Sequence, residues 1–224
     1  MTSHIVAIGG RGLDRELTRF VLALARGRRA CFLPTPSGDD AAHIVAFYDL
    51  YLAEGARATH LELFHRTVED LRAFLLAQDV IYVSGGNTAN ALAIWRVHGV
   101  DAILREAHEA GIVLCGSSAG CICWFEASIT DSFGLELAPL RDGLGLLRGS
   151  ACPHYDSEER RRPVYTRAVA DGLPAGLALE DGVAAHYVDG ELHEIVTVRD
   201  GAHAYRVERD GASVVERPLL VRRL

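Results

Sequence analysis

Lysine is absent from this chain of 224 residues, so arginine supplies all 23 of its basic side chains. Without lysine, the chain cannot form a Schiff base, build a phosphate-binding loop of the G-x-x-x-x-G-K type, or use a serine–lysine pair for hydrolysis. Side-chain amides are almost as scarce, because Gln78, Asn87 and Asn90 are the only three. Two of them fall close together, which draws attention to that stretch of the chain.

Acidic residues outnumber basic ones by 30 to 23 and give a net charge of −7. Such a chain has no general electrostatic attraction for nucleic acid or anionic lipid. No signal peptide precedes the strand-like run at Ile5–Ile8, and the longest uncharged stretch, residues 110–125, is too short and too rich in glycine and serine to span a bilayer. We therefore expect a cytoplasmic protein with no nucleic-acid or membrane partner.

Metal-binding and disulfide patterns are also missing. The chain has an odd number of cysteines and no C-x-x-C pair, so we expect reduced thiols. It has no H-E-x-x-H pair, and the spacing of His154 and Asp156 is a weak metal-ligand signal. The sequence predicts no metal site and no cofactor.

The first half of the chain alternates short apolar runs with segments of helical periodicity. The predicted strands are Ile5–Ile8, Ala30–Leu33, Thr59–Leu63, Val80–Val83 and Ile112–Cys115. The predicted helices are Asp14–Ala25, Asp40–Glu54, Val68–Ala77, Thr88–Val97 and Asp101–Ala110. Continuous hydrophobic strands separated by helices are typical of a doubly wound α/β fold, with a mostly parallel sheet and helices on both faces.

Beyond about residue 172 the pattern changes to that of antiparallel strands. Asp–Gly pairs stand at residues 181–182, 189–190, 200–201 and 210–211, between alternating runs. Because Asp–Gly is favoured in tight hairpin turns, we predict hairpins at these pairs. No linker separates this region from the rest, so we expect a single domain over residues 1–224.

The stretch 112–125 carries the clearest chemical signal. A strand-like run leads into Gly-Ser-Ser-Ala-Gly at residues 116–120, a G-x-S-x-G pattern, and an apolar helix-like run follows. This is the context of a nucleophile elbow, whose glycines allow a tight turn that exposes the central serine. We predict Ser118 as a nucleophile with the Ala119 amide beside the reacting carbonyl. The competing interpretation is an ordinary turn between a strand and a helix.

A second glycine turn, residues 84–90, also lies between a predicted strand and a predicted helix. In a parallel sheet both turns emerge at the carboxyl edge, where ligands bind. Gly86 is therefore a candidate for a second oxyanion amide. Asn87 is either a substrate-binding side chain or the cap of the following helix, and both interpretations stay open.

A serine nucleophile needs a base, normally histidine. Of the ten histidines, His154 stands between a short apolar segment and a charged helix, and hence at another predicted strand end. The acid that would orient it is Asp131, Glu126 or Asp156, and spacing alone does not choose among them.

Three motifs together resemble the peptidase E family of serine peptidases, which is related to cyanophycinase and, more remotely, to class I glutamine amidotransferases. They are G-S-S-A-G at 116–120, S-G-G-N-T at 84–88 and P-H-Y at 153–155, and the resemblance covers roughly residues 4–190. It implies a class I glutamine amidotransferase-like fold, with Ser118 as nucleophile and His154 as base. It also implies Gly86 and Ala119 as oxyanion donors, and favours Asp131 as the acid because the family acid follows the nucleophile helix.

The resemblance further implies cleavage of dipeptides with an N-terminal aspartate, whose carboxylate an arginine downstream of the histidine recognises. Here the candidates are Arg160 and Arg161, which follow a shortened loop. Arginine suits bidentate carboxylate binding, although Glu–Arg pairing on a helix surface explains the same residues. We expect a small peptide or amino-acyl substrate and a homodimer.

Four alternatives compete with this interpretation. The first two are an amidohydrolase of other specificity and a small-molecule-binding homologue without dipeptidase activity. A dinucleotide-binding loop at residues 9–12 is disfavoured because Arg15 stands where a third small residue is needed. A cysteine amidotransferase is disfavoured because Cys115 and Cys121 flank the elbow and miss its apex.

Overall fold

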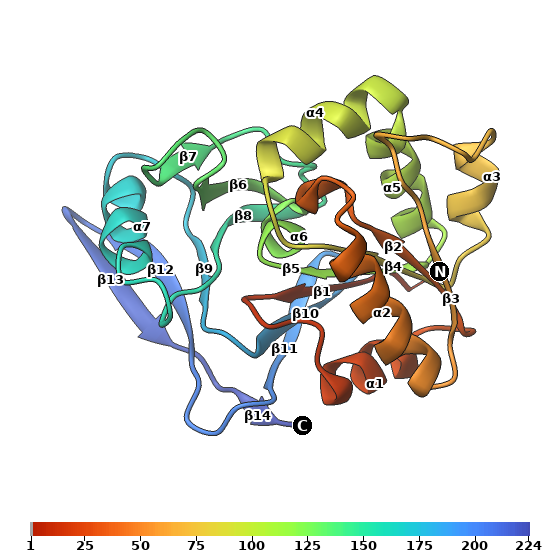
Figure 1. The fold of residues 1–224 in the computed structure, drawn as a ribbon. Coiled ribbons are helices and arrows are strands. Elements are labelled where there is room, and N and C mark those ends of the chain that lie inside the picture. The colour runs from red at the N-terminus through yellow and green to blue at the C-terminus, as the bar shows by residue number, and fades with distance from the viewer. Residues whose placement is uncertain (1) are drawn as a thin grey trace.

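The computed structural model describes residues 2–224 and shows an α/β fold built on two sheets that lie side by side (Figure 1). The strands are β1 His4–Ile8, β2 Arg29–Leu33, β3 Arg57–His60, β4 Val80–Val83, β5 Val113–Ser117, β6 Phe125–Thr130, β7 Ala138–Leu140, β8 Leu147–Cys152, β9 Gly176–Leu179, β10 Val183–Val188, β11 Glu191–Thr197, β12 Ala204–Asp210, β13 Ser213–Pro218 and β14 Arg222–Arg223. The helices are α1 Arg15–Leu24, α2 Ala41–Ala53, α3 Leu71–Leu76, α4 Thr88–His98, α5 Val100–Glu109, α6 Ala119–Ile122 and α7 Arg161–Ala170, with a short 3₁₀ helix, η1, at Thr35–Ser37.

The larger sheet has eight strands in the order β14-β11-β10-β1-β5-β4-β2-β3. From β1 to β3 every neighbouring pair is parallel, and β10 and β11 extend the sheet as antiparallel strands. The smaller sheet, β13-β12-β9-β8-β6-β7, is mixed. Its central strands β6, β8 and β9 are parallel to one another, while the pairs β6–β7, β9–β12 and β12–β13 are antiparallel. The predicted fold class, a largely parallel α/β layer with antiparallel strands near the C-terminus, is confirmed.

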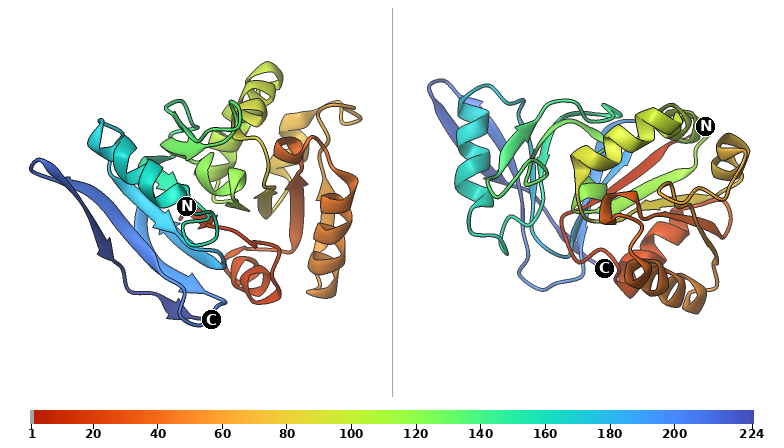
Figure 2. Two further views of the ribbon diagram at one scale, coloured as in Figure 1. Left: turned by 60° about the vertical axis from the view of Figure 1, so that its left-hand side comes forward. Right: turned by 45° about the horizontal axis from the view of Figure 1, so that its top comes forward.

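Both faces of the parallel strands are buried under helices (Figure 2). On β1, Ile5 and Ala7 pack with residues of α3, α4 and α5, while Val6 and Ile8 pack with residues of α1 and α2. Successive residues of a strand point to opposite faces, so a strand covered on both sides must be apolar throughout. This explains why the predicted strands of the first half were continuous hydrophobic runs.

The smaller sheet begins directly after the elbow, where the sequence predicted a helix. The observed helix α6 has only four residues, and Glu126 lies in β6 rather than on a helix. Trp124 and Phe125 are fully buried at this point, so the apolar run reflects burial between two sheets rather than a helix face. Helix α7 packs on the smaller sheet with its own apolar cluster, which includes Tyr165 and Val169.

Two of the four Asp–Gly pairs close hairpins as predicted, Asp189-Gly190 between β10 and β11 and Asp210-Gly211 between β12 and β13. The pairs at 181–182 and 200–201 instead stand where the chain crosses from one sheet to the other. The turn signal describes the local backbone only, and does not tell which sheet the next strand joins.

Two further expectations can be compared with the structure. All five cysteines are free thiols with buried side chains. Burial raises the pKa of the Cys31 and Cys152 thiols to about 12. Within residues 2–224, no helix has the length and apolar character needed to cross a membrane.

Candidate active site

Ser118 stands at the tip of a strained turn between β5 and α6. Its φ of 56° and ψ of −109° are unfavourable for a residue with a side chain, at a cost of about 1–3 kcal/mol. Its amide donates to the Ile8 carbonyl at 3.1 Å. A Cβ atom on Gly116 or Gly120 would overlap the carbonyl oxygen of Val83 at the end of β4. Both glycines are therefore needed for the close packing of the elbow, as the sequence predicted.

His154 follows β8 of the smaller sheet and meets Ser118 at the junction of the two sheets. Its Nε2 lies 2.9 Å from Ser118 Oγ, and its Nδ1 lies 2.8 Å from Asp181 Oδ1. The backbone is fixed as well, because the His154 amide donates to the Gly9 carbonyl at 3.2 Å. Hydroxyl, imidazole and carboxylate thus form the continuous chain of contacts that activates a serine.

Asp181 is the residue that sequence reasoning missed, since it was interpreted as part of a hairpin turn. Its side chain is only 8% exposed. Its amide donates to Asp156 Oδ1 at 2.9 Å, and Asp156 Oδ2 pairs with Arg199 at 2.8 Å. Burial raises the pKa of Asp156, but the Asp181 amide and Arg199 outweigh burial and lower the pKa below its usual value. An ionised Asp156 therefore holds the backbone of Asp181 in place.

The hydrogen bond to His154 that was expected of Asp131 is made by Asp181 instead. Asp131 is exposed in the turn after β6. The next residue in that turn, Ser132, accepts hydrogen bonds from the side chain of Asn87 at 3.0 Å and from the first turn of α4. This turn therefore fixes the start of α4.

The three predicted substrate-binding residues lie outside the pocket that contains Ser118. Asn87 caps α4, its side-chain oxygen accepting the Asn90 amide at 2.9 Å. Arg161 is 3% exposed and pairs with Glu158 at 2.7 Å, while Arg160 pairs with Glu136. Helix capping by Asn87 and Glu–Arg pairing by the two arginines, the competing interpretations from the sequence, therefore account for these side chains. Both arginines thus pair with carboxylates of the protein itself.

Free amides surround Ser118. Within residues 2–224, the backbone N–H groups of Gly85, Gly86 and Ala119 make no hydrogen bond. A Cβ atom on Gly85 would lie 3.4 Å from Ser118 Cβ, so this turn passes directly beside the serine, while Gly86 packs against the Pro36 carbonyl with a φ of 129°. Unpaired amides beside a nucleophile are the donors that an oxyanion requires. Because α6 has only four residues, its dipole adds little to the electrostatics around Ser118.

Ser118 and His154 line a pocket of about 290 Å³. The other lining residues are Arg11, Gly12, Leu13, Phe32, His43, Tyr82, Ser84, Gly85 and Ser117. Arg11 is the arginine among them; its side chain is 76% exposed and its Nε lies 3.5 Å from Asp181 Oδ2. Apolar walls with a few polar groups are typical of small-molecule sites, and this volume suits a small ligand.

The loop after β1 packs against the His154–Asp181 pair. A Cβ atom on Gly10 would overlap Asp181 Oδ1 and lie 2.6 Å from His154 Nδ1. The Gly10 carbonyl also accepts the amide of Gly182, next to Asp181, at 2.9 Å. Gly10, one of the glycines of the disfavoured dinucleotide loop, is therefore explained by the space that this pair needs.

Gly10→Ala is expected to lower kcat by about 100-fold or more, since a shift of about 1 Å in reacting groups costs that much. The measurement is steady-state kinetics on any cleaved peptide, with circular dichroism to verify folding. Gly190→Ala is the matched control: Gly190 has a φ of 83° with no atom near its Cβ position, so the substitution strains a turn far along the sheet. Equal loss of activity in both variants would contradict the role given to Gly10.

The chain is similar in sequence to a family of known proteins. The model of peptidase family S51 matches residues 8–195. A Bacillus subtilis (strain 168) protein named uncharacterized peptidase YgaJ is 43% identical over 229 residues, covering 99% of each chain. Peptidase E of Shewanella denitrificans is 29% identical over 168 residues, covering 69% of this chain and 71% of the relative.

Solved structures show the same fold. A putative peptidase E protein from Listeria monocytogenes EGD-e superposes with a TM-score of 0.62 at 18% identity, covering 98% of this chain and all of the other. A peptidase from an acI-B1 actinobacterium superposes with a TM-score of 0.71 at 16% identity, covering 99% and 95%. With a family match over most of its length and the serine, histidine and glycine motifs in one site, the chain belongs to peptidase family S51, the peptidase E family.

Proposed function

We propose that this peptidase cleaves small peptides through an acyl-enzyme formed on Ser118, with His154 as the base and Asp181 as the orienting acid. The observation that carries the proposal is the run of two short contacts, Ser118 Oγ to His154 Nε2 at 2.9 Å and His154 Nδ1 to Asp181 Oδ1 at 2.8 Å. Asp131, which the family resemblance favoured, has no place in this mechanism.

The proton transfers follow from the orientation of the His154 ring, whose Nδ1 faces Asp181 and whose Nε2 faces Ser118. His154 donates its Nδ1 proton to Asp181, which leaves Nε2 free to accept the Ser118 proton as Oγ attacks the scissile carbonyl carbon. The imidazolium then returns this proton to the leaving amine as the peptide bond breaks. Water then attacks the acyl-enzyme while His154 accepts a proton from it. His154 returns this proton to Ser118 as the acid product leaves.

The tetrahedral intermediate places a negative charge on the former carbonyl oxygen. The amides of Ala119 and of the turn that contains Gly85 and Gly86 lie beside Ser118 without acceptors of their own. Donors fixed before the reaction stabilise the developing charge without reorganisation. We assign the oxyanion site to these amides, which retains the predicted donors Ala119 and Gly86 and adds Gly85.

For substrate, we propose dipeptides with an N-terminal aspartate, whose side-chain carboxylate pairs with Arg11. Arg11 lines the pocket, and its contact with Asp181 at 3.5 Å is long and leaves most of the guanidinium exposed. Arg160 and Arg161, which were the candidates from sequence, are held by Glu136 and Glu158. An arginine at the pocket gives the bidentate partner that a carboxylate prefers.

A dipeptide panel that varies only the first residue tests this specificity. We expect Asp-first dipeptides to have the highest kcat/KM, and Arg11→Gln to lower it about 10-fold for them relative to Ala-first dipeptides, since a hydrogen bond between charged groups contributes about 1.5–3 kcal/mol. Any effect of Arg11→Gln on Asp181 changes kcat/KM for both substrates equally, so it cancels in the ratio of the two values. Arg160→Gln, on the surface, is the control that should leave the ratio unchanged. If Asp-first dipeptides are not cleaved, an amidohydrolase of other specificity replaces this proposal.

A further inference from the structure

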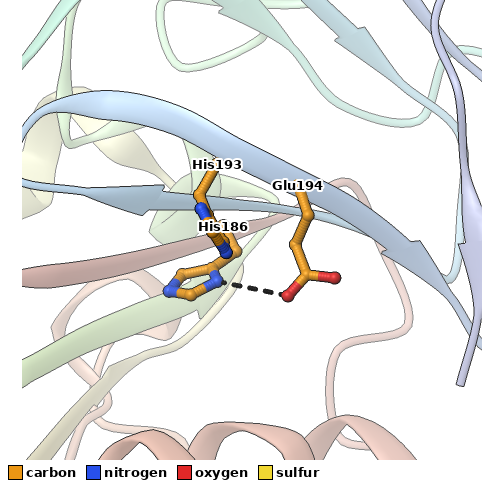
Figure 3. Close-up of side chains that lie close together, drawn as sticks. All are labelled: His186, His193 and Glu194. Atoms are coloured by element: carbon orange, nitrogen blue, oxygen red, sulfur yellow. Dashed lines mark ion pairs between the residues drawn. The ribbon is translucent and has the colours of Figure 1, made fainter.

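Two histidines and a glutamate that do not belong to the proposed triad lie close together on the larger sheet (Figure 3). His186 comes from β10, and His193 and Glu194 come from β11. One ligand atom from each residue lies within 4.8 Å of the other two. His186 Nδ1 and Glu194 Oε1 are 3.6 Å apart. None of these residues contributes to the mechanism described above.

An irregularity in the strand pairing brings these side chains together. His186 pairs with Glu194 and Tyr187 with Leu192, so His193 is an extra residue on β11. In a regular strand, His193 and Glu194 would point to opposite faces of the sheet. A β-bulge changes the direction of a side chain, and here it lets both approach the same imidazole.

The imidazole of His186 is held in one orientation and keeps one nitrogen unused. The residue is 3% exposed. Its Nε2 lies 3.0 Å from His4 Nδ1, and the edge of the ring packs on Phe20 of α1. Within residues 2–224, its buried Nδ1 makes no hydrogen bond, and this nitrogen faces Glu194. Buried polar atoms without partners are rare and call for an explanation.

The surroundings match those of a metal-binding histidine. Such a residue commonly donates its second ring N–H to a neighbouring acceptor, as His186 Nε2 can donate to His4 Nδ1. On Glu194, Arg222 occupies Oε2 at 2.7 Å and leaves Oε1 directed at the histidines.

We propose that His186 Nδ1, His193 and Glu194 Oε1 bind one divalent transition-metal ion of the zinc class. Two imidazoles and a carboxylate are a ligand set that zinc takes in proteins, whereas calcium and magnesium are bound by oxygen ligands. The atoms must move closer to reach zinc–ligand distances of about 2.0–2.2 Å, and the exposed side chain of His193 is free to do so. Solvent completes the coordination on the exposed side.

Such an ion would link β10 to β11. Because it binds the folded chain and bridges two strands, it raises the stability of the fold in proportion to the logarithm of its concentration. β10 also begins two residues after Asp181, so the linked strand is the one on which the orienting acid depends. The ion itself takes no part in peptide cleavage.

Isothermal titration of the full chain with ZnCl₂ at pH 7.5 tests this site. We expect one ion per chain, and at least a 10-fold loss of affinity in His193→Gln and in Glu194→Gln, two partly or fully exposed positions whose variants should fold. His65→Gln, an exposed histidine in a loop, is the matched control and should bind as the unmodified chain does. Circular dichroism verifies folding.

Titration with Co²⁺ gives a second readout, because visible absorption bands report a metal bound to defined ligands. These bands are expected in the unmodified chain and in His65→Gln, and should be lost in His193→Gln. No binding of zinc by the unmodified chain up to millimolar concentration would overturn the proposal. So would wild-type affinity in both His193→Gln and Glu194→Gln, which would place the ion elsewhere.

Discussion

Asp181→Asn is expected to lower kcat by about 10⁴-fold while leaving the fold intact, the size of effect seen when the acid of a Ser-His-Asp site loses its charge. The carboxylate accepts the Nδ1 proton of His154 at 2.8 Å. An asparagine amide group can donate to Nδ1 and so favours the opposite tautomer. Nε2 then carries a proton toward Ser118 and no longer accepts one. Steady-state kinetics and a thermal unfolding curve measure the two parts of this prediction.

Asp131→Asn is the matched control, since it makes the same chemical change at the acid that the family resemblance favoured. Asp131 is exposed in the turn that fixes the start of α4, so we expect turnover within about 3-fold of the unmodified enzyme, as for surface substitutions in general. A large loss in Asp131→Asn with little loss in Asp181→Asn would reverse the assignment.

Ser118→Ala is expected to abolish turnover, with a loss of about 10⁶-fold, because no other atom can form the acyl bond. The side-chain oxygen contacts only His154 within residues 2–224, so its removal should leave the thermal unfolding midpoint nearly unchanged. The alanine keeps the Cβ atom and meets the same φ of 56° as the serine. Turnover assays over long incubations, together with thermal unfolding, provide the test.

Ser117→Ala separates the nucleophile from its neighbour in the same motif. Ser117 Oγ accepts a hydrogen bond from the Tyr82 hydroxyl at 3.2 Å and makes no contact with His154. We expect Ser117→Ala to retain turnover within about 10-fold, because one neutral hydrogen bond contributes about 1 kcal/mol. Undiminished turnover in Ser118→Ala, or its loss only in Ser117→Ala, would exclude Ser118 as the nucleophile.

The elbow could be predicted from the sequence because the residues that form it are adjacent along the chain. Gly116 and Gly120 are required by the Val83 carbonyl, and Ser118 stands between them at fixed spacing. His154 could be found because it follows a strand, although nothing in the sequence showed that β8 belongs to a second sheet. Local patterns thus predicted the two residues whose positions depend on the segments next to them.

Asp181 could not be distinguished in the same way. Its Asp–Gly pair has the same signature as the hairpin turns at residues 189–190 and 210–211, and only the crossing between sheets brings it to His154. One usable signal was present: only Glu180 separates the pair from the fully apolar run Gly176–Leu179, so Asp181 stands at the end of a buried strand, where it is itself buried. A buried acid requires a partner, which a turn residue in solvent does not.

The choice of a carboxylate-binding arginine also depends on the tertiary structure. The sequence places Arg160 and Arg161 near His154 along the chain, but α7 carries them onto the smaller sheet, where Glu136 and Glu158 pair with them. Arg11 lies far from His154 in sequence and reaches the pocket because β1 and β5 are parallel neighbours. The single domain and the homodimer stay predictions of the sequence.

Labelling with a fluorophosphonate tests the central assignment most directly, because this reagent reacts with an activated serine and needs no knowledge of the substrate. We expect one label per chain, located on Ser118 by peptide mapping, and a labelling rate that falls sharply in Asp181→Asn and stays near the unmodified rate in Asp131→Asn. A chain that is not labelled, a label on another residue, or a rate that depends on Asp131 and not on Asp181 would contradict the account.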